Sequence, residues 1–212
     1  MMKKKQKVWK FGGERAYFSP LSGSEPCFEP EKWNHTMKKT HNCYAYVMDL
    51  IRPDMDRKPQ PGYSSGYGYL EDDDLRSCDK LYQRILSDNP SIHRVSFEQQ
   101  CPMGYRKGFL AVDDSEDPDY HFYRLDSNGY WSHKPGETEA TTLDGKKNKI
   151  WNPEEADRKG TDHNYTKPCT FFCYDPKKAR ISNKIQEGGR KKKKIGITHG
   201  KKRCHRRKLH RK

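Results

Sequence analysis

One cysteine and two histidines have the residue types and the order that thiol chemistry requires. Cys43 follows Asn42, a residue type that often caps a helix N-terminus. His121 and His133 lie on either side of a turn-forming segment, residues 126–129. A thiolate attacks carbonyl carbon, and a helix N-terminus or a nearby imidazolium lowers a thiol pKa from its usual value of about 8.5. The sequence therefore predicts a thiol nucleophile at Cys43, with the two histidines as its base and its orienting group.

A purely structural reading of the same residues stays open. A single cysteine near the start of a helix is more often a small buried side chain than a nucleophile. A histidine on an aromatic strand, such as His121 beside Phe122 and Tyr123, is more often a hydrogen-bonded packing residue than a base. The order of the three residues, on a helix and then on a hairpin, favours the catalytic reading.

The two histidines meet only in one hairpin register. If residues 127–129 form a three-residue loop with Gly129 in the left-handed conformation, Leu125 opposes Trp131 and both histidines share one face of the sheet. If residues 126–129 form a four-residue loop, His133 points away from His121. A glycine at the last loop position favours the first register.

The elements that must position these residues indicate an α+β fold. A helix begins after Asn42 and runs to Ile51, where Pro53 ends it, and an acid-rich amphipathic helix follows between Asp72 and Leu86. Strands are predicted at residues 104–112, 120–125, 130–134 and 170–174. Residues 53–69 form a turn-rich loop of the kind that often makes a rim or lid. We expect helices packed on one face of a small antiparallel sheet.

Composition divides the chain into three parts. Residues 177–212 contain 17 Lys and Arg and a single acid, whereas the preceding residues contain 26 basic and 28 acidic residues. Residues 1–39 are a basic arm and a loop-rich lead-in that aromatic side chains such as Trp33 pin to the body. Residues 40–175 form the folded domain, and residues 176–212 form a basic tail. The tail is predicted to be disordered, because it repels itself and buries no apolar surface.

The chain has seven cysteines with irregular spacing, no apolar leader after the N-terminal lysines and no transmembrane run. These features predict a reduced, intracellular protein with free thiols. Cys169 and Cys173 fall on one face of the last strand if it is regular. With His163 they have the residue types for zinc, but the spacing is not that of a usual zinc knuckle and favours two thiols in the core. No metal site and no cofactor are therefore expected.

Other side chains fit supporting roles around the thiol. Asn42 and Gln60 are candidate donors for an oxyanion on the bound carbonyl, and the sequence does not rank them. Tyr123, Tyr130 and Trp131 have rings that stack on ligands, although packing on the sheet is the commoner use of such residues.

The arrangement resembles the papain-like cysteine hydrolases of the NlpC type, which have a cysteine at a helix N-terminus and two histidines on adjacent strands. The runs at 42–46, 59–62, 121–124 and 129–136 also resemble an uncharacterised family found in bacteria and giant DNA viruses. The NlpC resemblance implies a papain-like fold and hydrolysis of a peptide or amide substrate, with Cys43 as nucleophile, His121 as general base and His133 as orienting group. The sequence lacks a cell-wall-binding module, which argues against a cell-wall substrate.

The basic tail predicts a second role, non-specific association with the phosphate backbone of nucleic acid. A nuclear address and a membrane-surface contact are the rival readings, and the tail has no aromatic residues to insert into a membrane. The residues expected to contact phosphates are Arg190, Lys191, Lys192, Lys193, Lys194, Lys201, Lys202, Arg203, Arg206, Arg207 and Lys208.

Two functions follow as alternatives. The first is a thiol hydrolase whose tail associates with nucleic acid, in the host cytoplasm or nucleus and packaged in a virion if the giant-virus resemblance holds. The second is a non-catalytic structural protein of the virion or of nucleic acid, built on the same fold. The sequence indicates no oligomeric state.

Overall fold

The computed structural model describes residues 8–11, 14–33 and 36–187 of the 212-residue chain. The predicted phosphate-contacting residues of the tail, from Arg190 to Lys208, lie outside these ranges. The described elements are β1 (Val8–Phe11), β2 (Glu14–Tyr17), η1 (Pro30–Trp33), α1 (Thr36–Thr40), α2 (Cys43–Val47), η2 (Tyr63–Ser65), α3 (Asp72–Leu75), α4 (Cys78–Asp88), β3 (His93–Val95), β4 (Arg106–Asp113), β5 (Asp119–Leu125), β6 (Trp131–His133) and β7 (Lys167–Tyr174).

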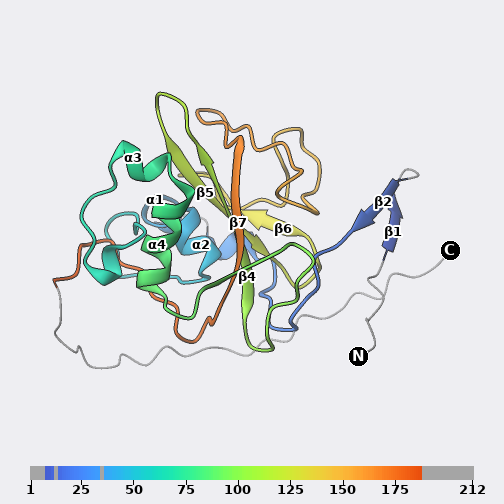
Figure 1. The fold of residues 1–212 in the computed structure, drawn as a ribbon, viewed down its shortest axis with the longest axis horizontal. Helices are drawn as coiled ribbons and strands as arrows, with labels where there is room; N and C mark the ends of the chain where they lie inside the picture. Colours follow the sequence, from blue (N-terminus) through green and yellow to red (C-terminus); the bar gives the residue numbers. More distant parts are fainter. Residues whose placement is uncertain (1–7, 12–13, 34–35, 188–212) are drawn as a thin grey trace.

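A five-stranded antiparallel sheet with the order β3-β7-β4-β5-β6 organises the body, and the helices lie on one side of it (Figure 1). The α+β class and the antiparallel sheet predicted from the sequence are confirmed. Strand β3 and the separate β1–β2 hairpin were not predicted. No helix in the described part of the chain combines the length and the apolar character that crossing a lipid bilayer requires.

Alternating side chains of the strands build two cores. Leu110, Phe122 and Phe172 pack with the helices. Their neighbours in sequence, Phe109, Tyr123 and Phe171, pack on the opposite face of the sheet. Gly108 lets α2 approach the sheet closely, because a Cβ there would lie 2.5 Å from a ring atom of Phe172. The same Cβ would lie 2.7 Å from a methyl group of the helix residue Val47.

Helix α2 is shorter than the sequence predicted. It ends at Val47 rather than near Pro53, because Asp49 takes a left-handed conformation with φ of 52°. In that conformation its carboxylate accepts from Arg106 at 2.6 Å and from Arg124 at 2.9 Å. Arg124 is 1% exposed, so a shared carboxylate compensates a buried charge that would otherwise be costly.

The predicted acid-rich helix is divided into α3 and α4. The break comes at Ser77, whose hydroxyl caps α4 by accepting from the N–H of Lys80 at 3.3 Å. Arg76 turns at this break and donates to the carbonyl oxygens of Ser115 and Glu116, which joins α3 to the β4–β5 turn.

The prediction that the cysteines are free thiols is wrong. Cys78 is bonded to Cys169, and Cys101 is bonded to Cys173. Cys27 is also disulfide-bonded, and Cys43 is the one free cysteine of the described residues. Such bonds are typical of oxidising compartments.

The predicted placement of Cys169 and Cys173 on one face is wrong as well. Thr170 pairs with Leu110 and Pro168 with Ala111, so Cys169 is the extra residue of a β-bulge. The bulge turns its sulfur toward the helix face, where Cys78 begins α4, and this excludes the zinc alternative. No cluster that could hold a metal ion occurs among the residues that the structure describes.

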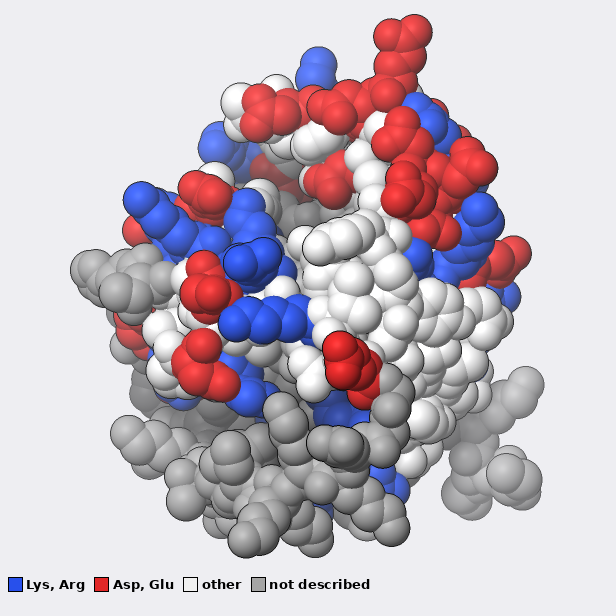
Figure 2. Space-filling view, turned by 90° about the vertical axis from the view of Figure 1, so that its left-hand side faces the viewer, with Lys and Arg blue, Asp and Glu red and all other residues white. Residues whose placement is uncertain are grey.

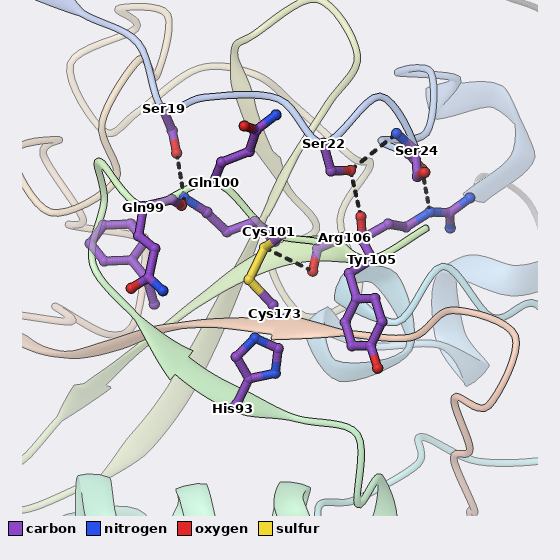
Figure 3. Close-up of a disulfide and its surroundings, with 12 residues drawn as sticks. Ser19, Ser22, Ser24, His93, Gln99, Gln100, Cys101, Tyr105, Arg106 and Cys173 are labelled. Carbon is purple, nitrogen blue, oxygen red and sulfur yellow. Dashed lines mark hydrogen bonds between the residues drawn. A yellow bond between two sulfur atoms is a disulfide. The ribbon is translucent and has the colours of Figure 1, made fainter. Parts of the chain in front are cut away.

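The second disulfide helps to hold the N-terminal lead-in (Figure 3). The disulfide joins the loop that precedes β4 to strand β7. Ser22 Oγ of the lead-in donates to the Tyr105 carbonyl oxygen of this loop at 2.6 Å. Arg106 Nε, at the start of β4, donates to the Ser24 carbonyl oxygen at 2.9 Å. Trp33 is 2% exposed, which confirms that an aromatic side chain pins this segment.

Candidate active site

Cys43 is the first residue of α2, and Asn42 caps the helix as predicted. The side-chain oxygen of Asn42 accepts from the N–H of Ala45 at 3.3 Å, while its amide nitrogen donates to the Pro59 carbonyl oxygen at 2.9 Å. The cap residue is therefore anchored to both the helix and the following loop. This double anchoring fixes the position of the cysteine that follows it.

The sulfur of Cys43 meets strand β5 at an edge that β6 leaves open. Strand β6 pairs only with Tyr123, Arg124 and Leu125, and the Cys43 Sγ lies 3.8 Å from the Tyr120 carbonyl oxygen. The backbone N–H of Phe122 also interacts with the sulfur and lowers its pKa. These two backbone groups flank His121, so the sulfur lies beside the backbone of the predicted base.

Burial keeps Cys43 in the thiol form. The side chain is 5% exposed, and desolvation, followed by the charge of Asp119, raises the pKa of the thiol to about 12. The N–H groups of Phe122 and of Tyr44, in the first turn of α2, act in the opposite direction and lower this pKa, but burial outweighs them. Cys43 is therefore a neutral thiol near pH 7, and it donates to the Tyr120 carbonyl oxygen.

The predicted hairpin register is confirmed. Gly129 has φ of 89°, Leu125 pairs with Trp131, and Tyr123 pairs with His133. His121 and His133 consequently share the sheet face opposite the helices, and His121 Nε2 lies 2.8 Å from His133 Nδ1. Within the described residues, no hydrogen bond joins Cys43 to His121.

The hydrogen bonds of the two histidines assign their tautomers. His133 Nε2 lies 3.0 Å from the Leu143 carbonyl oxygen, which only accepts, so His133 carries its proton on Nε2. Its Nδ1 must then accept from His121 Nε2. A neutral His121 therefore has an unprotonated Nδ1, the atom that a base needs.

Both imidazoles are neutral near pH 7. Burial, followed by the charges of His133 and Lys134, holds the pKa of His121 well below its usual value of 6.5. Burial lowers the pKa of His133 to about 4, although the Leu143 carbonyl opposes this shift. The pair is therefore a neutral relay of hydrogen bonds rather than an imidazolium.

Two tyrosines enclose the relay: Tyr165, which sequence reasoning did not single out, and Tyr123, which it offered as a ligand-stacking or packing residue. The Tyr165 ring stacks on His121 with centroids 4.9 Å apart, and its hydroxyl donates to Asp119 at 2.8 Å. Tyr123 stacks on His133 with centroids 4.8 Å apart. His121 is 2% exposed, so the site is closed in this structure. Tyr165 follows a turn-rich stretch with no sequence signal that links it to His121.

The two oxyanion candidates meet at Tyr120, a third residue that the sequence did not single out. The Tyr120 hydroxyl donates to Gln60 Oε1 at 2.7 Å and accepts from Asn42 Nδ2 at 3.2 Å. The amide nitrogen of Asn42 is thus engaged in holding the cap and the loop. The packing alternative is confirmed for Trp131 and Tyr123, which are 0% and 2% exposed in the core opposite the helices.

The surface beyond the site has an acidic end. Acidic side chains gather at the top of the face in Figure 2, where α3 and the β4–β5 turn lie. They come from two segments that Arg76 joins, residues 71–74 and 113–119. An acidic surface repels phosphate groups, so the predicted contact with nucleic acid depends on the basic tail.

No family model matches the chain. The chain is similar to insoluble matrix shell protein 1 of Ruditapes philippinarum, with 36% identity over 132 residues. The matched region is 62% of this chain and 80% of the relative. No solved structure matches. The papain-like and NlpC-like classification therefore stays a prediction.

Proposed function

The chain belongs to the family of insoluble matrix shell protein 1, and we propose that it is a thiol hydrolase acting through Cys43, His121 and His133 on a peptide or amide substrate. One observation carries the proposal. The hydrogen bonds from His121 to His133 and from His133 to the Leu143 carbonyl oxygen leave the base nitrogen of His121 unprotonated. The Cys43 sulfur lies beside the backbone of the same residue, at the edge of β5 that β6 leaves open.

The proposed reaction has two steps. His121 Nδ1 takes the proton of the Cys43 thiol as the sulfur attacks the carbonyl carbon, which forms a C–S bond. His121 then gives that proton to the leaving amine as the C–N bond breaks. In the second step a water molecule attacks the carbonyl carbon of the thioester and gives one proton to His121. The C–S bond then breaks, the acid product leaves, and His121 returns the proton to the sulfur. His133 keeps the His121 ring in the required tautomer throughout, as a positioning residue.

The developing oxyanion requires hydrogen-bond donors. We propose the backbone N–H groups in the first turn of α2 for this role, because one of them, that of Tyr44, already acts on the sulfur. Gln60 is the remaining side-chain candidate, since Asn42 is engaged as the helix cap.

Substrate entry requires the site to open. Cys43 and His121 are 5% and 2% exposed, and Tyr165 covers His121. Tyr165 packs against the core opposite the helices, but its neighbours Asn164 and Thr166 are exposed. Displacement of this stretch is the smallest change that uncovers the imidazole.

Multiple-turnover hydrolysis tests the proposal. The full chain is incubated with p-nitrophenyl acetate and, separately, with a mixed fluorogenic peptide-amide library, and product release is followed near pH 7.5. We expect Cys43→Ser to abolish turnover and His121→Gln to lower it by about 100-fold. His93→Gln, at a histidine of β3 outside the site, is the matched control and retains wild-type turnover. Turnover that survives Cys43→Ser would exclude this nucleophile.

The disulfides favour an oxidising setting for this function. Cytosolic and nuclear proteins seldom keep such bonds, whereas the structure has Cys78–Cys169 and Cys101–Cys173. We therefore propose that the protein works outside the reducing cytoplasm, in place of the intracellular site predicted from the sequence. Packaging in a virion rests on the sequence resemblance alone and stays a prediction.

A second candidate is a non-catalytic component of an insoluble extracellular matrix. The relative carries the name of an insoluble matrix protein, and the closed site and the disulfides suit a scaffold. This candidate predicts that Cys43→Ser and His121→Gln leave every binding property unchanged and that no substrate is turned over. The turnover experiment above separates the two candidates.

The tail proposal is independent of the site. We propose that the basic residues after Glu187 bind nucleic acid without sequence preference. A chain truncated after Glu187 should lose retention on duplex DNA at about 0.1 M salt, where the full chain is retained and elutes as salt rises. Equal retention of both chains would refute this role.

A further inference from the structure

Lys134 is a buried cation without an anionic partner. It directly follows β6, its side chain is 0% exposed, and its Nζ donates to the carbonyl oxygens of Lys38 at 3.1 Å and Gly136 at 2.8 Å. Glu137, which is close in sequence, instead pairs with Lys58 at 3.2 Å. Among the described residues, Lys134 takes part in no ion pair.

Burial of a charge with only neutral partners is costly. The cost appears in the titration of Lys134: desolvation lowers its pKa to about 8, so that it is still mainly protonated at pH 7. An anion formed next to this ammonium group would recover part of that cost. Electrostatic influence joins Lys134 to Cys43, Lys58, Glu137, Lys38, His41 and His121.

Cys43 is the group among these that forms a new anion in the proposed reaction. Strand β6 ends at the pair of His133 with Tyr123, so Lys134 leaves the sheet at the same open edge of β5 that the Cys43 sulfur contacts through the Tyr120 carbonyl oxygen. At this edge the charges of Cys43 and Lys134 act on each other, and each favours the ionised form of the other. The two histidines of the relay are neutral and supply no positive charge at pH 7. Glu137 is already paired.

We propose that Lys134, rather than a protonated His121, is the cation that stabilises the Cys43 thiolate. The inference rests on the proposed thiol chemistry at Cys43 and adds to it a cation that stabilises the nucleophile directly. When the thiol ionises, its proton passes to His121 Nδ1 and from there to solvent, and Lys134 keeps its own proton. The thiolate and the ammonium group then form a buried ion pair.

The pair has a distinctive dependence on pH. Below about pH 8 Lys134 is charged, and the thiolate fraction of Cys43 rises tenfold per pH unit. Above about pH 8 Lys134 loses its charge, and this loss offsets the further ionisation of the thiol. The logarithm of a rate that depends on the thiolate should therefore bend downward near pH 8.

Alkylation of the full chain by iodoacetamide between pH 6 and 9.5 tests the inference, with the rate at Cys43 resolved by peptide mass spectrometry. The reagent is neutral, so Lys134 does not steer it. We expect the downward bend in the wild type and a straight line of unit slope in Lys134→Met. At pH 7 the Lys134→Met rate should be lower by at least about tenfold. Lys134→Arg should stay within about threefold of the wild type, because it keeps the charge.

The form of the profile separates electrostatics from a structural role. If Lys134 only holds the carbonyls of Lys38 and Gly136, its deprotonation above pH 8 loosens the site and the profile bends upward. An upward bend, or a wild-type line with no bend, overturns the inference. The control Lys39→Met removes an exposed charge from α1, the helix that contains Lys38. It should leave both the bend and the labelling rate unchanged.

Failure of the inference and failure of the proposed hydrolase are distinguishable. A downward bend that Lys134→Met removes, in a chain that turns over no substrate, supports the ion pair and contradicts the hydrolase. Turnover that His121→Gln lowers and Lys134→Met leaves unchanged supports the hydrolase and overturns the role of Lys134.

Discussion

Removal of the disulfide between Cys78 and Cys169 should destabilise the fold by an amount that the second disulfide limits. The two cysteines are 91 residues apart, and closure of a loop of that length in the unfolded chain corresponds to about 4.6 kcal/mol in the chain-entropy model. The Cys101–Cys173 bond, however, already shortens the path between them to about 27 residues. The expected loss for Cys78→Ala with Cys169→Ala is therefore about 3.6 kcal/mol.

The same path length applies to the other bond. Removal of Cys101–Cys173 alone should also cost about 3.6 kcal/mol of loop entropy, although its cysteines are 72 residues apart. Removal of both bonds should cost about 8 kcal/mol, which is more than twice either single loss. Cys101 and Cys173 are 3% and 0% exposed, so their replacement adds a packing loss that the Cys78 and Cys169 pair largely avoids.

Equilibrium unfolding in urea, without reductant, measures these differences as free energies of unfolding. The first double variant is the cleaner probe. A variant with Ala at Cys78, Cys169, Cys101 and Cys173 reports the loss of both bonds, because dithiothreitol would also reduce the disulfide of Cys27. A single-bond loss of 4.6 kcal/mol or more at Cys78–Cys169 would show that the second bond does not shorten the loop. A reduced wild type as stable as the oxidised protein would refute the disulfide assignment, and with it the proposed oxidising setting.

Three further outcomes follow from the packing and the titration of the site. Gly108→Ala should lower the free energy of unfolding in urea by about 1–3 kcal/mol, because α2 leaves no room for a Cβ. The control Gly68→Ala, at a position with open space, should change it by less than about 0.5 kcal/mol. Equal effects of the two substitutions would contradict the close approach of α2 to the sheet. The folded state holds the pKa of His133 at about 4, below the unfolded value of 6.5, so the unfolded chain binds more protons and His133 alone should lower stability by about 3 kcal/mol between pH 6.5 and 4. His133→Gln should flatten that decline, and an unchanged decline in the variant would refute the assignment. Tyr165→Ala removes a ring contact with His121 worth about 0.5–1.5 kcal/mol. It should therefore speed iodoacetamide labelling of Cys43 by about 2- to 12-fold. Tyr130→Ala is the control, and an unchanged labelling rate in Tyr165→Ala would show that Tyr165 does not cover the site.

Local signals predicted the parts of the site that local chemistry determines. Asn42 caps α2 because its side chain satisfies an N–H group three residues later, a bond encoded within one turn of helix. Gly129 sets the hairpin loop length, and the loop length sets the register that brings His121 to His133. These contacts require no knowledge of the rest of the fold.

Contacts between distant segments account for what the sequence did not predict. Asp49 ends α2 early because arginines from β4 and β5 bind its carboxylate, and neither arginine is near it in sequence. A bulge at Cys169 reverses the face of one cysteine, which periodicity alone treats as regular. Disulfide pairing depends on the completed fold, and an odd count of cysteines gave no guide to it.

The buried charges were also outside the reach of the sequence. Lys134 belongs to a polar run after β6, where an exposed lysine is the usual outcome. Its burial follows from the carbonyl of Lys38 on α1, a contact across 96 residues. Tyr165 covers His121 through a similarly distant contact.

Direct detection of an acyl thioester on Cys43 tests the central claim most directly. The full chain is mixed with p-nitrophenyl acetate, quenched in acid within seconds to minutes, digested and analysed by mass spectrometry, for the wild type and for His121→Gln. The thiol hydrolase predicts an acetyl group on Cys43 that forms first in the wild type, decays as product is released, and forms about 100-fold more slowly in the variant. Acetyl groups confined to lysines, or equal acetylation of Cys43 in both proteins, would contradict it.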